Sequence, residues 1–210
     1  DQVMAQLAGL QVWELGGVQP NPRLSLVREG IALCREQGIQ LVLAVGGGSA
    51  IDTAKAIANG VCYDGDVWDL FDGKGKNTEV LPLGTVVTIP AAGSEMSDSC
   101  VITREEDLCK RGRNTPLNFP KFSILNPEFT YTLPPFQTAC GVVDIMAHMM
   151  ERYFTRVTHV ELIDRMTEGA LKTVVNNAPI VMQDPENYDA RAEIMWAGCL
   201  AHNTLLQTGR

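Results

Sequence analysis

The stretch 40–59 constrains the fold of this 210-residue chain more than any other part of it. Residues 41–45 form a continuous apolar run of strand length, which is typical of a parallel strand covered on both faces. Three glycines follow at 46–48, and a helix starts after them, where Ser49 and Asp52 have the spacing of a capping box. The apolar face of this helix is expected to contain Ala50, Ile51, Ala54, Ile57 and Ala58. The stretch therefore predicts one strand–turn–helix unit of an α/β fold.

The glycine turn at 46–48 is suited to binding an anion. A helix start presents free N–H groups and a positive dipole end, and glycine lets a pyrophosphate approach the backbone closely. The turn is neither a Gly-x-Gly-x-x-Gly pattern nor a Walker loop, because no Gly-Lys-Ser/Thr follows it. Two interpretations stay open on the residues alone: a phosphate or dinucleotide cradle, which we favour, and an ordinary tight turn.

Composition excludes several classes of partner. Hydrophobic residues make up 45% of the chain and the formal net charge is −8, which argues against nucleic acid or an anionic membrane as a partner. No apolar run is long enough to cross a bilayer. The six cysteines are scattered without a Cys-x-x-Cys pair, so we expect reduced thiols and a cytoplasmic protein.

The order of the expected elements divides the chain in two. Helices are expected at 1–10 and 24–37, the second ending at Gly38, and strands at 11–15, 41–45, 83–89, 100–103 and 122–125. The segments 61–76 and 104–121 are expected to be irregular and exposed, with Trp68 and Phe71 as anchors in the first. Beyond 127 only helical periodicity remains, at 137–154, 160–178 and 185–207. The sequence predicts an α/β domain over 1–127 and a helical domain over 128–210.

Asp144 and His148 lie at positions i and i+4 of the first helix of the second part. This spacing puts both side chains on one face, with Cβ atoms roughly 5–6 Å apart. In such apolar surroundings the two groups are costly unless they are paired or bind a metal, and both are ordinary ligands of Zn²⁺ or Fe²⁺. A simple Asp–His hydrogen bond is slightly favoured by the spacing alone. His202, on the last expected helix, is a candidate third ligand, although a solvated or capping histidine is the favoured interpretation; His159 lies in a loop.

Five motifs resemble those of the iron-containing (group III) alcohol dehydrogenase family. They are 16–22 (GGVQPNP), 46–52 (GGGSAID), 88–95 (TIPAAGSE), 132–135 (TLPP) and Asp144-x-x-x-His148, in family order along the chain. The resemblance is strongest to the NADP-dependent butanol dehydrogenase and aldehyde reductase branch. It implies a dehydroquinate synthase-like fold: an N-terminal dinucleotide-binding α/β domain followed by an all-α domain, with a metal in the cleft between them.

The resemblance also implies roles for individual residues. Gly47, Gly48 and Ser49 would bind the cofactor pyrophosphate, and further positions would contact the cofactor: Asn21, Asp52, Thr88, Ser97 and Lys110. Asp144 and His148 match the first two of four metal ligands and would be catalytic through the metal. The implied activity is hydride transfer between NADP or NAD and a primary alcohol or aldehyde, with Fe²⁺ or Zn²⁺, in a homodimer.

Relatives in this family are nearly twice as long as this chain. We therefore expect an internal fragment, truncated at both ends, without the family's first strand and glycine loop and without two histidine ligands that follow the equivalent of Arg210. Such a fragment would bind metal weakly and be inactive by itself. Ala92 and Asn126 stand where family members usually have Thr and Asp. The alternatives are a glycerol dehydrogenase-like or dehydroquinate synthase-like relative, or a non-catalytic nucleotide-binding module.

Overall fold

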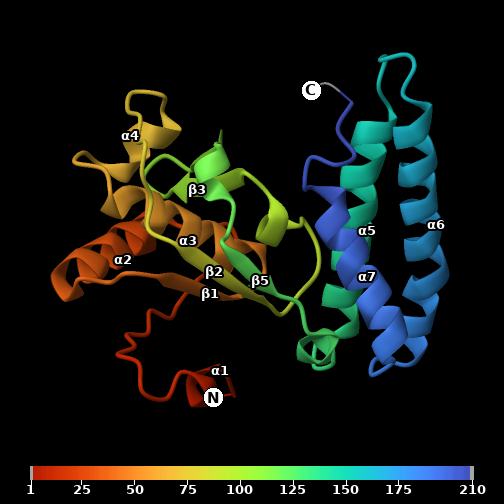
Figure 1. Cartoon of the computed structure of the whole chain (residues 1–210), viewed down its shortest axis with the longest axis horizontal. Helices are drawn as coiled ribbons and strands as arrows, with labels where there is room; N and C mark the ends of the chain where they lie inside the picture. The colour runs from red at the N-terminus through yellow and green to blue at the C-terminus, as the bar shows by residue number, and fades with distance from the viewer. Residues whose placement is uncertain (1, 209–210) are drawn as a thin grey trace.

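The computed structural model describes residues 2–208 and has two parts that lie side by side (Figure 1). The first part contains α1 (Gln2–Gln6), α2 (Leu24–Gln37), β1 (Val42–Gly46), α3 (Gly48–Val61), α4 (Val67–Phe71), β2 (Leu83–Val87), β3 (Ser99–Arg104), β4 (Cys109–Asn114) and β5 (Phe122–Ile124). The second part contains α5 (Pro135–Tyr153), α6 (Glu161–Gln183) and α7 (Tyr188–Ala201). Three short 3₁₀ turns, η1 (Ser94–Met96), η2 (Pro116–Asn118) and η3 (Pro127–Thr130), complete the described elements.

A parallel sheet of three strands, in the order β1-β2-β5, forms the centre of the first part. Ala44 of β1 and Val87 of β2 pack against Ile51 of α3 in one buried cluster. The opposite face is less covered than the sequence predicts, because Val45 is 46% exposed. The expectation of a β1 strand buried on both faces is therefore wrong, whereas β2 is buried along its whole length.

Helix α3 begins two residues earlier than the capping-box pattern indicates. Gly47 is the N-cap, and Ser49 lies inside the first turn, where its carbonyl accepts a bond from the Thr53 hydroxyl. Asp52 points elsewhere, to the Ser94 hydroxyl and the Val101 N–H. The predicted capping box is wrong because Ser49 lies inside the helix and the Asp52 carboxylate bonds to residues after β2 instead of to the helix start. The predicted apolar face is correct, since Ile51, Ala54, Ile57 and Ala58 are all buried.

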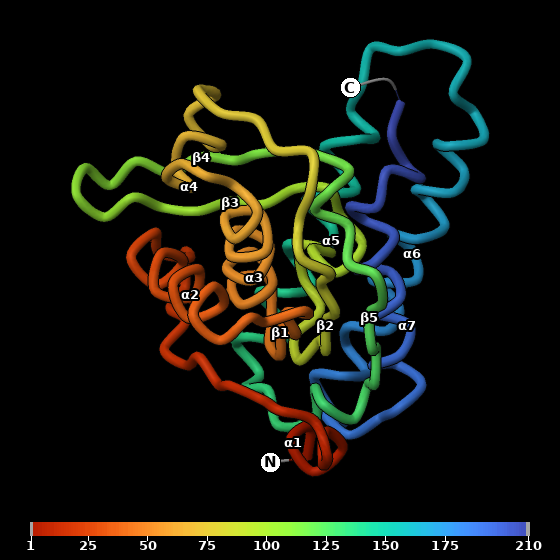
Figure 2. Tube along the Cα trace, turned by 60° about the vertical axis from the view of Figure 1, so that its left-hand side comes forward, coloured from red at the N-terminus to blue at the C-terminus, as the bar shows by residue number. Residues whose placement is uncertain are grey.

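Two segments expected to be irregular contain regular structure. Residues 61–76 include α4, whose N-cap Asp66 accepts the Trp68 N–H, and Trp68 and Phe71 are buried anchors as predicted. Within 104–121, β4 pairs antiparallel with the whole of β3 to form a hairpin that extends past α4 (Figure 2). The charged sequence of β4 hides this strand because it lacks apolar alternation and depends on β3 as its partner.

The start of the chain departs from the prediction in a different way. Of the helix expected over 1–10, the described residues form only the short α1, and residues 11–15 form no strand. Val12 and Trp13 are exposed, and Leu15 alone packs against the core formed by α2, α3 and α4. The alternation at 11–15 is real, but among the described residues no strand pairs with this segment. Helix α2 and its end at Gly38, which has φ 63°, agree with the prediction.

The three long helices of the second part pack into one core. Ile145 and Met149 of α5, Val174 and Val181 of α6, and Ile194 of α7 are buried together. The break expected at 179–184 is wrong, because α6 continues through Pro179 to Gln183. Buried residues on both sides of the proline, Val174 and Val181, hold the helix against its neighbours. Helix α7 ends at Ala201, so His202 caps the helix instead of lying on it, and 185–207 is only partly helical.

The two parts touch where β2 ends. A Cβ on Gly141 of α5 would collide with the Pro90 carbonyl oxygen, and a Cβ on Gly93 would lie 2.6 Å from the Gly198 carbonyl oxygen of α7. Met195 of α7 completes the cluster of β1, β2 and α3. The helical part therefore meets the carboxyl end of the sheet, the edge at which open α/β sheets bind ligands.

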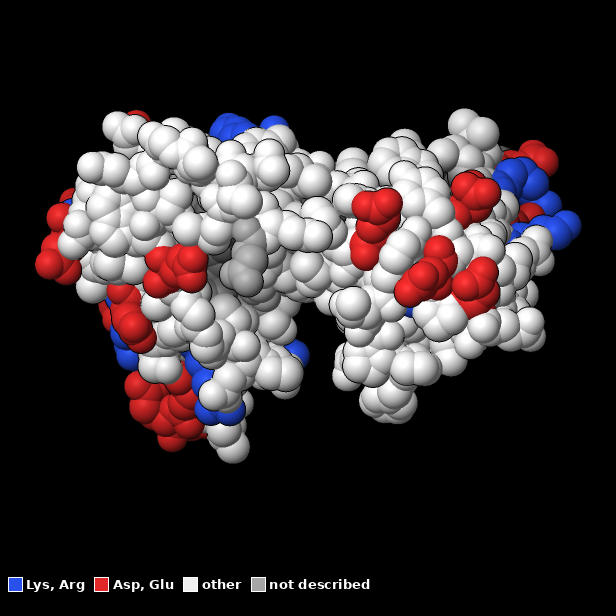
Figure 3. Space-filling model, turned by 90° about the horizontal axis from the view of Figure 1, so that it is seen from below, with Lys and Arg blue, Asp and Glu red and all other residues white. Residues whose placement is uncertain are grey.

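The outer surface shows how the parts are separated. Seen from below, the molecule has a notch between the sheet part and the helical part, with carboxylates on the surface of both parts (Figure 3). Within residues 2–208, no helix combines the length and the apolar character needed to cross a membrane.

Candidate functional site

The turn between β1 and α3 has the geometry of an anion-binding site. Gly46 has φ 156°, in the region that favours glycine, and its carbonyl accepts the Thr88 N–H at 3.1 Å. The first helical N–H to find a backbone partner is that of Ile51, which donates to Gly47. A Cβ on Gly48 would meet nothing within 4 Å, so open space faces this glycine at the helix start. Gly47, Gly48 and Ser49 thus offer free N–H groups to an anion.

Asp144 and His148 lie on one face of α5, as the i, i+4 spacing predicts. The Asp144 Oδ1 to His148 Nε2 distance is 3.7 Å, and the two side chains are 46% and 25% exposed. The backbone carbonyl of His148 accepts a 2.9 Å bond from Arg152 one turn later. At 3.7 Å the two atoms are not within good hydrogen-bond distance, but both could bind one ion at about 2.1 Å each.

His202 reaches this pair from α7. Its ring meets the His148 ring edge-on, with centroids 4.9 Å apart, while its Nδ1 lies 2.6 Å from the Ser97 hydroxyl oxygen. Burial, and to a lesser extent the neighbouring Arg152 and His148 side chains, lower the pKa of His202 to about 4. His159 is exposed in a loop with φ 62°. Across residues 2–208 no three His, Cys, Asp or Glu side chains form a group that could hold a metal.

Ser97, Asp52 and Lys110, which the resemblance assigns to the cofactor, already have protein partners. Ser97 is fully buried against His202. Asp52 binds the Ser94 hydroxyl and the Val101 N–H, and burial raises its pKa although Ser94 and Lys55 act against the shift. Lys110 donates to the Asn21 side chain at 2.8 Å. Cofactor contacts of these residues, and of Thr88, therefore stay predictions.

Two buried charged residues at this edge were missed by the sequence reasoning. Lys55 is fully buried on α3 and donates to oxygen atoms of the segment 94–99. Glu95 is 4% exposed and accepts a hydrogen bond from the Cys199 thiol. The pKa of this thiol is raised, mainly by burial and secondly by the charge of Glu95. The spacing of Asp52 and Lys55, three apart on a helix, was the available signal for the first.

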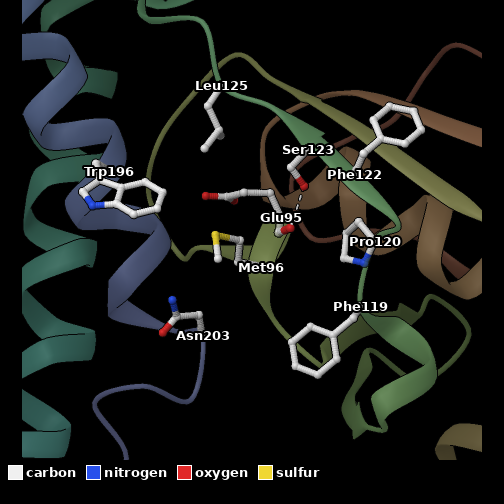
Figure 4. Close-up of a pocket in the computed structure, with 9 residues that line it drawn as sticks. All are labelled: Glu95, Met96, Phe119, Pro120, Phe122, Ser123, Leu125, Trp196 and Asn203. Atoms are coloured by element: carbon white, nitrogen blue, oxygen red, sulfur yellow. Dashed lines mark hydrogen bonds between the residues drawn. The ribbon is translucent and has the colours of Figure 1, made fainter.

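A cleft of about 430 Å³ lies between β5 and α7. Its walls include Phe119, Trp196 and Asn203, and the Glu95 side chain points into it from the turn after β2 (Figure 4). None of the residues predicted for the cofactor or the metal lines this cleft. The glycine turn before α3 and the Asp144–His148 pair therefore lie outside this cleft.

Comparison of the sequence with models of known protein families identifies the family of this chain. A family model described as iron-containing alcohol dehydrogenase matches residues 1–127. The chain belongs to the iron-containing alcohol dehydrogenase family. A second model, for the C-terminal region of Fe-containing alcohol dehydrogenases, matches residues 138–209. The resemblance found in the five motifs is thus confirmed.

Individual relatives in the iron-containing alcohol dehydrogenase family are similar over nearly the whole chain. The chain is 50% identical to a probable NADH-dependent butanol dehydrogenase 1 of Bacillus subtilis, covering 100% of this chain and 54% of the relative. It is 40% identical to the NADPH-dependent aldehyde reductase YqhD of Escherichia coli, covering 100% and 55%. The crystal structure of NADH-dependent butanol dehydrogenase A from Thermotoga maritima has a TM-score of 0.91 at 38% identity, covering 96% and 50%.

These comparisons confirm the predicted fold class, an α/β region followed by helices. The chain spans about half the length of the curated relatives it matches. The names of the relatives include both NADH and NADPH, so they do not distinguish the coenzyme of this chain.

Proposed function

We propose that this chain forms the dinucleotide cradle and two of the metal ligands of a metal-dependent alcohol dehydrogenase or aldehyde reductase that uses NAD(P). The observation that carries the proposal is the position of the Asp144–His148 pair. It lies on α5, the helix whose Gly141 packs against Pro90 directly after β2. Family membership, with relatives named as butanol dehydrogenases and an aldehyde reductase, supports the same conclusion.

The residues at the site fit both a divalent metal ion and the pyrophosphate of a dinucleotide. A carboxylate oxygen and an imidazole nitrogen 3.7 Å apart suit one Fe²⁺ or Zn²⁺ ion, although a stable catalytic site needs about three protein ligands. The open space before Gly48 suits a pyrophosphate. When bound, the metal supplies Lewis-acid polarisation of the alcohol or carbonyl oxygen, and the nicotinamide supplies or accepts the hydride.

The chain's own residues act by binding and orientation. The start of α3 holds a negatively charged group through backbone N–H groups, and the missing side chain at Gly48 leaves the approach clear. Arg152 fixes the turn of α5 that carries His148, and Ser97 fixes the ring of His202 against it. We place the domain boundary at about residue 127.

The location and the oligomeric state are proposed from the sequence. The six cysteines are free, which supports the cytoplasmic location that the sequence predicts. A homodimer stays a prediction.

Replacement of His148 by alanine tests the metal role. In a protein of the relatives' full length, we expect His148→Ala to lower metal content at least tenfold and to remove most alcohol-dependent NAD(P)H formation. Dinucleotide affinity should change less than threefold, because the cradle lies on α3 and the pair on α5. Metal analysis, an alcohol oxidation assay and a dinucleotide titration measure the three quantities.

His159→Ala is the matched control, because it removes an exposed imidazole from a loop. We expect this variant to keep both its metal and its activity. Equal metal content in His148→Ala and His159→Ala would remove the basis for assigning the pair to a metal site. For residues 1–210 alone we expect little bound metal and negligible turnover, since the described part holds only two of the ligands.

A further inference from the structure

The Lys55 ammonium group is buried where the sheet part meets the helical part. It is fully inaccessible to solvent and lies within bonding distance of four oxygen atoms. These are the carbonyl oxygens of Ser94 (2.6 Å), Ser97 (2.9 Å) and Ser99 (2.8 Å), and the Ser94 hydroxyl (3.0 Å). A buried cation is costly unless its donors are satisfied, and here every acceptor comes from one segment, 94–99.

Asp52 holds the same segment from the preceding turn of α3. Its two carboxylate oxygens accept the Ser94 hydroxyl at 2.7 Å and the Val101 N–H at 3.0 Å. Burial lowers the pKa of Lys55, and the negative charge of Asp52 opposes that shift. The charges of Asp52 and Lys55 therefore stabilise one another, and together they bind both ends of the segment to α3.

The segment 94–99 in turn contacts the helical part through Ser97. The Ser97 hydroxyl lies 2.6 Å from Nδ1 of His202, directly after α7, and also accepts the Ser99 N–H at 3.0 Å. The His202 ring packs edge-on against His148. A continuous series of contacts thus runs from Lys55 through Ser97 and His202 to His148.

We propose that Lys55 is a positioning residue: by holding the segment 94–99 on α3, it places Ser97 against His202 and so sets where His148 lies relative to the cradle. The segment is short, polar and turns through η1, so it has little apolar packing of its own to fix it. The functional consequence rests on the proposed dehydrogenase activity, whereas the structural consequence does not.

Hydrogen exchange on the ligand-free protein tests the structural consequence. Lys55→Met keeps the length of the side chain and removes its donors. We expect amides of 94–99 and of 202–206 to exchange at least tenfold faster in this variant, with α2 and α6 unchanged within twofold. Arg191→Met is the matched control, because Arg191 is an equally buried cation that donates to the Pro185 carbonyl and the Thr138 hydroxyl. It should leave exchange of 94–99 unchanged.

Ser97→Ala separates the two steps and serves if Lys55→Met does not fold. The variant keeps the carbonyl that Lys55 binds but loses the link to His202. We expect faster exchange at 202–206 with 94–98 within threefold of the unmodified protein; the Ser99 amide is left out of this comparison because the Ser97 hydroxyl is its acceptor. Uniform acceleration over the whole chain in Lys55→Met, or unchanged exchange at 202–206 in Ser97→Ala, would overturn the proposal.

Steady-state kinetics on a protein of the relatives' full length test the functional consequence. We expect Lys55→Met to lower kcat at least tenfold while KM for the dinucleotide stays within threefold, because the cradle itself lies two turns earlier on α3. Arg191→Met, a change of stability alone, should not produce this split. If the unmodified protein had no alcohol-dependent activity, the proposed function would be contradicted. The exchange experiment would then still test whether Lys55 positions the segment 94–99. Equal losses in kcat for both variants would overturn the positioning role.

Discussion

Gly47 and Gly48 are neighbours, but their missing side chains meet different surroundings. A Cβ on Gly47 would overlap the Ile89 side chain after β2, whereas a Cβ on Gly48 would meet nothing within 4 Å. The first glycine therefore serves the packing of two βα turns against each other. The second has no packing reason to be glycine, which is what a position facing a bound pyrophosphate would show.

Valine substitutions distinguish these two requirements. We expect Gly48→Val to fold with a free energy of unfolding within about 1 kcal/mol of the unmodified protein, because its side chain enters open space. Its NAD(P)H affinity should fall at least tenfold. Gly47→Val should instead lose about 1–3 kcal/mol of stability through overpacking against Ile89. Denaturant unfolding and a fluorescence titration measure both, and undiminished affinity in a folded Gly48→Val would refute the cradle.

Sequence reasoning found the glycine cluster but could not assign a role to each glycine. The pattern at 46–48 indicates a strand followed by an anion-binding helix start; the structure has the strand and the helix in these places, and anion binding stays a prediction. Nothing in the pattern shows that Ile89, some forty residues later, lies against Gly47. Lys55 was missed for the same reason, because its oxygen partners come from a segment that only the fold brings to it.

At the scale of elements, periodicity predicted what depends on a buried face and missed what depends on a partner. Helices α2 and α5 and the strand β2 were found because each carries its own apolar pattern. Strand β4 was missed because it has almost no apolar residues and exists through its pairing with β3. The alternation at 11–15 indicated a strand, but pairing decides whether one forms, and the described residues provide none.

Arg113 is the residue of β4 that anchors the hairpin to the body of the protein. Its guanidinium donates at 2.6 Å to the side-chain oxygens of both Asn59 on α3 and Asn77. We expect Arg113→Ala to destabilise the protein by about 1–3 kcal/mol, because partly buried amide oxygens lose charged donors. Denaturant unfolding measures the loss.

Arg111 offers a control on the same strand. Its half-exposed guanidinium pairs with Asp72 at 3.2 Å, and Asp72 keeps a second cation, Lys74 at 2.7 Å, when Arg111 is removed. Arg111→Ala should leave the unfolding midpoint almost unchanged. If the two variants lost the same stability, general strand propensity rather than the Asn59–Asn77 anchor would account for the hairpin.

At the scale of the whole molecule, close backbone approach at two glycines is one of the contacts that join the two parts, beside the Ser97–His202 and Cys199–Glu95 contacts. Gly141 of α5 rests on the Pro90 carbonyl, and Gly93 lies against Gly198 of α7. The Met195 side chain packs in the cluster formed with residues of β1, β2 and α3. The sequence predicted a helical second part, but glycines inside helices carry no signal of which surface they approach. The relative placement of the cradle and the Asp144–His148 pair therefore came from the structure alone.

Two helical glycines test whether this contact sets the site. Gly141 of α5 faces the Pro90 carbonyl, whereas Gly169 of α6 has nothing within 4 Å of its Cβ position. Gly169→Ala should stabilise the protein by about 1 kcal/mol, because alanine is the better helix former. Gly141→Ala gains the same propensity but must push α5 away from the loop, so we expect a net loss of about 1–3 kcal/mol of stability.

The same displacement of α5 should also affect the Asp144–His148 pair. These two residues follow Gly141 by one and two helical turns, so they should move away from the cradle together with the helix. In a protein of the relatives' full length we expect Gly141→Ala to lower kcat at least tenfold with metal still bound, and Gly169→Ala to leave kcat unchanged. Denaturant unfolding and steady-state kinetics on both variants measure the difference, and equal behaviour of the two would show that the junction at Pro90 does not determine the geometry of the site.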